Sequence, residues 1–129
     1  PIAVFEPRRA LDLIARERVS VISGPPTLFA TLLAHPDFEP ARTRSLRIAF
    51  VGAAAVPTEL IRAMHERMGI ARVINAYGLI EVCVVSMTRA ADPEAVIATT
   101  TGRAMPGVEV RIVDAGGRDI PDGGSGEIQ

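Results

Sequence analysis

The residues best suited to chemistry lie together in the segment Asn75–Glu81, which contains an aromatic ring, a glycine and one carboxylate. Apolar runs flank this segment, and we expect it to form a tight turn between two buried strands. Gly78 beside Tyr77 lets a flat ligand approach the backbone closely, because glycine has no side chain. The Glu81 carboxylate in such a place is either a metal ligand or a costly buried charge. The segment therefore predicts a nucleotide site with a hard cation nearby.

A second element without bulky side chains, Gly52-Ala53-Ala54-Ala55, follows another apolar run, Leu46–Val51. We expect this run and the run Ala71–Ile74 to be neighbouring parallel strands. Ligands in such sheets bind beyond the carboxyl ends of the strands. Because Gly52 and Tyr77 both lie at such ends, the sequence predicts that they share one site.

The elements that would position this site alternate between helix and strand. We expect helices at Pro7–Arg18, in a segment that stops before Pro36, and from Pro57 to Gly69, with a first strand at Val19–Ile22. The polar segment 37–45 is expected to be a surface loop. Strand-helix-strand units of this kind predict an α/β fold with a parallel, doubly wound sheet and helices on its faces. The apolar stripes of the three helices are Ala10, Leu11, Ile14 and Ala15; Leu28, Phe29, Leu32 and Leu33; and Leu60, Ile61, Met64 and Met68.

The last third of the chain has a different character. We expect Asp92–Thr101 to be a polar connection and Gly102–Gly107 to be a turn-rich bridge. Alternation of apolar and polar residues over Val108–Val113 predicts a half-buried strand at an antiparallel edge. A turn at 121–126 then leads into a new strand at the end of the chain. We accordingly expect an α/β part at residues 1–90 and a partial β subdomain at residues 91–129.

Composition limits the classes of function. The chain has 129 residues and 13.7 kDa, is 48% hydrophobic and 22% charged, and carries a net charge of −1. These values predict a folded domain and no nucleic-acid or anionic-membrane partner. No apolar run reaches the roughly 20 residues that a membrane-spanning helix needs. One cysteine, Cys83, excludes an internal disulfide, fits a reducing cytoplasm and is expected to be inert packing in a strand.

Several motifs in the right order make the chain resemble the adenylate-forming, AMP-binding superfamily, specifically an acyl-CoA synthetase (fatty-acid–CoA ligase). The resemblance covers essentially the whole chain and implies an internal fragment of the large N-terminal domain of such an enzyme. It is carried by Val19-Ser20-Val21-Ile22-Ser23-Gly24-Pro25-Pro26-Thr27, Ser45-Leu46-Arg47, Gly52 to Pro57, Tyr77-Gly78-Leu79-Ile80-Glu81, Thr101-Gly102-Arg103, Pro106-Gly107, the strand at Val108–Val113 and Gly126-Glu127-Ile128.

The resemblance implies a two-step reaction with ATP and Mg²⁺. A hydrophobic carboxylate would attack the α-phosphate of ATP, giving an acyl-adenylate and releasing pyrophosphate. The thiol of coenzyme A would then displace AMP from the acyl-adenylate to form a thioester. In this family pattern Glu81 would bind the Mg²⁺ at the phosphates, and Tyr77 would pack beside the adenine. Gly78 and Leu79 would face the junction between AMP and the acyl group. The base pocket would be lined by Gly52, Ala53, Ala54, Asn75 and Ala76.

Two departures from the family pattern bear on activity. Ile80 stands where the family usually has a threonine that bonds a phosphate oxygen. The loss of one such bond to a charged group costs on the order of 1.5–3 kcal/mol. Ala53 stands where a second glycine is common, a milder change. The chain also contains no lysine, since its 14 positive charges are all arginine. The lysine-bearing phosphate loop is expected upstream and the mobile C-terminal domain downstream, so we expect the isolated chain to be inactive.

Other interpretations remain open at this point. Without the resemblance, Glu81 is a solvated turn residue, Tyr77 is a half-buried core aromatic, and Gly52 allows close packing of helix on sheet. An aryl-acid or amino-acid activating enzyme would share much of the sequence pattern. A degenerate, non-catalytic nucleotide-binding module is a further alternative, and Ile80 favours it. Exposed edges of an incomplete sheet also predict self-association of the chain.

Overall fold

The computed structural model describes residues 4–121 and 123–129. Five helices and seven strands lie in this part of the chain. They are α1 (Pro7–Glu17), β1 (Val21–Gly24), α2 (Pro26–Ala34), α3 (Pro40–Thr43), β2 (Ile48–Gly52), α4 (Thr58–Glu66), β3 (Arg72–Leu79), β4 (Cys83–Met87), α5 (Glu94–Thr99), β5 (Arg103–Ala104), β6 (Ile112–Val113) and β7 (Glu127–Ile128).

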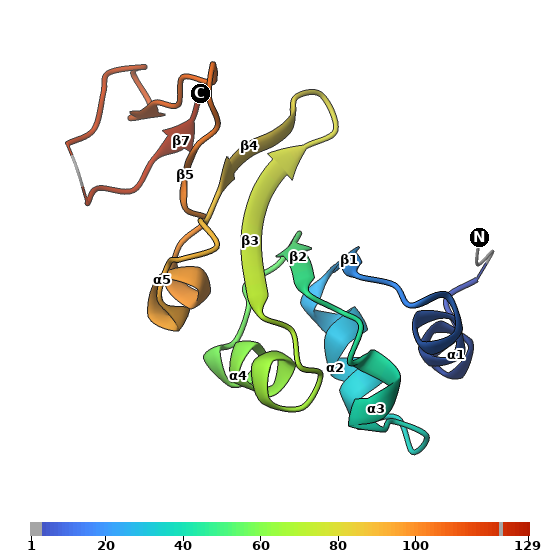
Figure 1. Cartoon of the computed structure of the whole chain (residues 1–129). Helices are drawn as coiled ribbons and strands as arrows, with labels where there is room; N and C mark the ends of the chain where they lie inside the picture. The colour runs from blue at the N-terminus through green and yellow to red at the C-terminus, as the bar shows by residue number, and fades with distance from the viewer. Residues whose placement is uncertain (1–3, 122) are drawn as a thin grey trace.

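A five-stranded sheet in the order β1-β2-β3-β4-β5 organises the fold (Figure 1). β1, β2 and β3 are parallel neighbours, whereas β4 and β5 add to β3 as antiparallel strands. The predicted α/β class with parallel strands and flanking helices is confirmed. Because β1, β2 and β3 follow one another in a single direction, right-handed crossovers place α2 and α4 on the same face of the sheet. Helix contacts accordingly run in series from α1 to α2, to α4 and to α5.

The core lies between this row of helices and the sheet, and the predicted stripe of α4 is fully buried at Ile61, Met64 and Met68. α4 ends at Glu66 with Arg67 as its C-cap, earlier than predicted, and Gly69, the expected helix stop, takes a φ of +72° in the turn that follows. One stripe residue of α1 was predicted wrongly, because Ala15 is exposed while Ala10, Leu11 and Ile14 are buried. The largest fully buried side chains are Phe29, Leu11, Leu32, Leu46, Ile61, Met64, Met68 and Ile70.

Three elements begin later than predicted because the residues before them belong to helix caps or to the turn after a helix. The amide of Val19 donates to the carbonyl of Ile14 at 3.1 Å in the cap of α1, so β1 begins two residues later than expected. The amide of Leu46 donates to the carbonyl oxygen of Thr43 at 2.9 Å, so β2 begins at Ile48. Pro57 is the N-cap of α4 rather than its first helical residue.

Two segments predicted as loops contain helices. The polar segment 37–45 holds α3, which begins at Pro40 and buries Thr43 against the core. The connection Asp92–Thr101 holds α5, in which Ile97 is buried. Both predictions were wrong because a single turn or two of helix is too short to show a clear apolar period.

The predicted hairpin exists, but its turn lies further along the chain than expected. β3 continues through Tyr77 and Gly78 to Leu79, and the turn is Ile80-Glu81-Val82. Cys83 opens β4 with a φ of +58° and is exposed, so the prediction of an inert buried cysteine was wrong. The tip is exposed because nothing in the described residues packs against it.

The C-terminal antiparallel segment is confirmed but is shorter than predicted. Only Ile112–Val113 forms a strand, paired with Glu127–Ile128, and Val108 and Val110 are exposed. Asp122, within the predicted turn at 121–126, lies outside the described residues. Among the described helices, none combines the length and the apolarity that crossing a bilayer would require.

Candidate functional site

A pocket of about 640 Å³ lies at the carboxyl ends of β2 and β3. It joins the two segments that the sequence predicted to share a site, because β2 and β3 are neighbours and Gly52 stands opposite Ala76 in their register. A third segment, the end of α5, closes the pocket. The lining residues are Ala53, Ala54, Ala55, Asn75, Ala76, Tyr77, Gly78, Ala98, Thr99, Thr100 and Thr101.

Gly52 supports the pocket from outside its lining. A Cβ atom at this position would lie 2.5 Å from the carbonyl oxygen of Ala76, so only glycine allows the two strands to approach this closely. Gly52 instead borders a shallow hollow on the sheet, together with Phe50, Val84 and Met87. The structure thus gives Gly52 a packing role at the edge of the site.

Ala53 turns the chain from β2 toward the pocket. Its φ of +66° is in the left-handed region, which an alanine adopts at some cost in energy. After this turn Ala54 and Ala55 are exposed on the pocket rim, and Val56 is buried again as the chain enters α4. The alanines leave an open wall because none carries an atom beyond Cβ.

Tyr77 and Gly78 line the pocket at an irregularity in the β3–β4 pairing. The register shifts between these two residues. A Cβ atom on Gly78 would overlap the carbonyl oxygen of Cys83, so β3 and β4 can approach each other this closely only at a glycine. The shift leaves the Tyr77 ring half-buried and part of the pocket lining.

Asn75, in β3, holds the end of α5 in place through side-chain hydrogen bonds. Its side-chain nitrogen donates to the carbonyl oxygens of Ile97 at 3.0 Å and Thr100 at 2.9 Å. Its backbone amide donates to the hydroxyl of Thr88 at 2.9 Å. Because an amide has two N–H groups and both are used, only the side-chain oxygen Oδ1 is left to accept a bond from a ligand.

The three consecutive threonines at the end of α5 are the part of the site that the sequence did not predict. The hydroxyls of Thr99 and Thr100 donate to the helix carbonyls of Ala95 and Val96 at 2.6 and 2.8 Å. The hydroxyl of Thr101 accepts a bond from Ser86 at 3.0 Å. The sequence signal was present as a run of threonines before Gly102, but it was interpreted as a loop.

The connection before α5 is held by Asp92. Its carboxylate accepts the backbone amide of Arg89 at 2.7 Å and lies 3.4 Å from the guanidinium of Arg103. The Arg89 amide and, to a smaller extent, Arg103 lower the pKa of Asp92 below its ordinary value of 3.8, against the opposing effect of desolvation. This carboxylate fixes the approach to the pocket wall rather than facing the pocket.

Glu81, Ile80 and Leu79 lie at the hairpin tip, on the same hairpin as Tyr77 but outside the pocket lining. Ile80 is 97% exposed and Leu79 is 48% exposed. No set of three metal-binding side chains gathers anywhere in residues 4–121 and 123–129. A single carboxylate still suits Mg²⁺, which keeps several waters and takes its other ligands from phosphates. Glu81 is therefore compatible with a phosphate-bound Mg²⁺ and not with a site built from protein ligands alone.

Comparisons with known proteins find matches over most or all of the chain. A family model described as AMP-binding enzyme matches residues 1–129. The chain is 42% identical over 116 residues to a 3-[(3aS,4S,7aS)-7a-methyl-1,5-dioxo-octahydro-1H-inden-4-yl]propanoyl:CoA ligase of Rhodococcus jostii, covering 90% of the chain and 22% of that protein. It is 36% identical over 130 residues to the putative acyl-CoA synthetase YngI of Bacillus subtilis, covering 99% of the chain and 24% of that protein.

A solved structure gives the same result at the level of the fold. The ATP-bound structure of MatB from Rhodopseudomonas palustris superposes with a TM-score of 0.82 and 29% identity, covering 99% of this chain and 25% of that one. This chain thus spans about a quarter of the length of the relatives that it matches.

Proposed function

The chain belongs to the AMP-binding enzyme family, and from this premise we propose that it carries the adenine-binding part of an ATP-dependent acid–CoA ligase. The observation that supports the proposal most strongly is the single pocket shared by Ala53–Ala55, Asn75–Gly78 and Thr99–Thr101. Its volume of about 640 Å³ falls within the ordinary range of small-molecule sites. The whole enzyme would form an acyl-adenylate from ATP and an acid, and then a CoA thioester.

The pocket suits a flat purine. Alanine methyl groups and the Tyr77 ring both line the pocket, so a base bound there would contact apolar surface. Asn75 Oδ1 would accept a hydrogen bond from the exocyclic amine of adenine. Guanine presents a carbonyl oxygen at that position, so the same group would repel it.

The phosphates would extend from the pocket toward the hairpin tip, where Glu81 would hold Mg²⁺. The metal ion, when bound, would neutralise charge on the phosphates so that a carboxylate can approach them. Leu79 and Gly78, next to the tip, would face the acyl group. The exposed apolar side chains of Leu79, Val82 and Val84 suit a hydrophobic acid.

We propose a hydrophobic carboxylic acid as the substrate class. The Rhodococcus relative is named for a propanoyl group on a methylated, dioxygenated ring system, which belongs to this class. We also propose a cytoplasmic location, since one free cysteine fits a reducing compartment. The same proposal includes a boundary at residues 90 and 91 between the α/β part and the partial β subdomain. It also includes inactivity of the chain by itself and its self-association through sheet edges.

A non-catalytic nucleotide-binding module is the second candidate, and the exposed Ile80 in place of a threonine favours it. Titration of Mg-ATP into the complete protein distinguishes the two. For a ligase, we expect Tyr77→Ala to weaken ATP binding and Tyr77→Phe to retain it. Glu81→Gln should abolish the increase in ATP affinity that Mg²⁺ causes. Tight ATP binding with no Mg²⁺ effect and no thioester product would favour the module. Equal ATP affinity in the wild type and Tyr77→Ala would contradict both.

A further inference from the structure

A second hollow, of about 500 Å³, lies between the end of α1 and α3, and four of its lining residues are arginines. It is separate from the nucleotide pocket. Arg18 and Arg44 precede the strands β1 and β2, whereas the nucleotide pocket lies beyond the carboxyl ends of β2 and β3. The lining residues are Ala15, Arg16, Arg18, Ala41, Arg42, Arg44 and Ser45.

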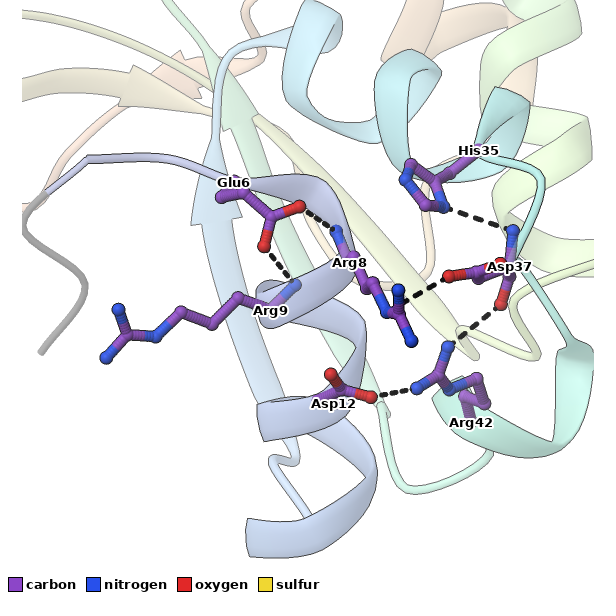
Figure 2. Close-up of polar contacts among 7 residues, drawn as sticks. All are labelled: Glu6, Arg8, Arg9, Asp12, His35, Asp37 and Arg42. Atoms are coloured by element: carbon purple, nitrogen blue, oxygen red, sulfur yellow. Dashed lines mark hydrogen bonds and ion pairs between the residues drawn. The ribbon is translucent and has the colours of Figure 1, made fainter.

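α1 and α3 are in contact, and Figure 2 shows the polar contacts of Arg42, one of the residues that line the hollow. The guanidinium of Arg42 pairs with the carboxylate of Asp12 and donates to the carbonyl oxygen of Asp37 at 3.0 Å. Its side chain is only 23% exposed, so this arginine is held in place. Ala15 and Ala41 leave space between the two helices because their side chains are small.

The positive charge in this hollow is only partly compensated. Arg42 is paired with Asp12, and Arg16 with Glu17 at 2.7 Å. Arg18 and Arg44 make no ion pair with any residue that the structure describes. The surroundings are also basic, since residues 1–72 contain ten arginines and seven carboxylates, whereas residues 73–129 contain four arginines and eight carboxylates.

We infer that this hollow is a second binding site, for a small anion that carries one or more phosphoryl groups. Guanidinium groups bind phosphate oxygens through paired hydrogen bonds, which a lysine ammonium cannot reproduce. Arg18 and Arg44 supply the two uncompensated guanidiniums, and Arg16 and Arg42 form the rest of the basic wall. The volume admits a diphosphate or a ligand of nucleotide size. No part of the adenine pocket takes part.

The direct test is titration of inorganic diphosphate into the 129-residue chain, followed by calorimetry and by NMR of the arginine side-chain Nε–H groups. We expect the signals of Arg18 and Arg44 to shift together. We expect the double variant Arg18→Gln/Arg44→Gln to bind at least about tenfold more weakly, because each guanidinium supplies a charge-assisted hydrogen bond. The matched control Arg62→Gln/Arg89→Gln removes the same charge from exposed positions elsewhere and should change the affinity by less than about twofold.

Two results would overturn the inference. Equal losses of diphosphate affinity in the two double variants would show that binding depends only on the total charge of the chain. A variant Arg18→Gln/Arg44→Gln that is less stable but binds diphosphate normally would show that these arginines only complement the ends of α1 and α3. A last comparison identifies the source of the phosphoryl group. Vesicles containing phosphatidic acid should fail to compete if the recessed site takes a free anion, and competition that depends on Arg18 and Arg44 would assign it to a lipid headgroup.

Discussion

The side-chain nitrogen of Asn75 lies 2.9 Å from the carbonyl oxygen of Thr100, and this hydrogen bond attaches the end of α5 to β3. The bond matters for the site because Thr99, Thr100 and Thr101 line the nucleotide pocket only when the helix end is held there. A buried side chain therefore sets the position of a pocket wall.

Replacement of Asn75 tests this attachment. We expect Asn75→Ala to lower the free energy of unfolding by about 1–3 kcal/mol, because two carbonyl oxygens lose their donor. Asn75→Asp, which keeps the size but has no N–H groups, should be at least as unstable. Urea unfolding measures both, and a stable Asn75→Asp variant would show that the donors are unimportant.

Ala53 offers a stabilising substitution at the pocket rim. Its φ of +66° favours glycine, so we expect Ala53→Gly to raise the free energy of unfolding by about 0.5–1 kcal/mol. Ala54 is the matched control, since its φ is not positive, and Ala54→Gly should destabilise by a similar amount. The midpoints of thermal unfolding of the two variants should shift in opposite directions from the wild type. A shift in the same direction would argue against strain at Ala53.

How much of this structure could be foreseen from the sequence depended on the length of each pattern. The stripe Ile61, Met64 and Met68 predicted α4 correctly because it spans about two helical turns, although Met68 lies just beyond the end of α4 at Glu66. β2 and β3 are the parallel neighbours that the sequence predicted, with Gly52 opposite Ala76, but Gly52 lies outside the pocket lining and β3 continues past Tyr77 to Leu79. α5 was missed because six residues give no clear period and because its position depends on the distant Asn75. The exposed Cys83 was missed because the shift in β3–β4 pairing is a tertiary feature.

Ile80 makes the sharpest functional prediction. If the family threonine normally bonds a phosphate oxygen, Ile80→Thr should raise the rate of acyl-adenylate formation by the complete protein roughly tenfold to a hundredfold. Ile80→Val is the control, because valine has the shape of threonine without its hydroxyl group. Pyrophosphate release measures both variants. Equal rates for the threonine and valine variants would mean that the hydroxyl has no partner at this exposed tip.

Acid should weaken the C-terminal segment through Asp114. Bonds from the amide and guanidinium of Arg118, and then from the amide of Gly116, lower the pKa of Asp114 below its ordinary value of 3.8. A lowered folded-state pKa stabilises the fold above the unfolded-state value, and this contribution is lost as the pH falls through the folded-state pKa. We expect Asp114→Asn to be less stable than the wild type near neutral pH and to converge with it below about pH 4. Unfolding measured across this range checks the sign, and a difference that grows in acid would refute it.

The most direct test of the nucleotide pocket uses the methyl groups of its alanines. With ¹³C-methyl alanine in the complete protein, addition of ATP should shift Ala53, Ala54, Ala55, Ala76 and Ala98 together, with a single dissociation constant. Ala10 and Ala30, which belong to α1 and α2 and line neither the nucleotide pocket nor the arginine-lined hollow, should not follow that binding curve. If the alanines after β2 respond to ATP while Ala76 and Ala98 do not, these segments do not form one adenine pocket.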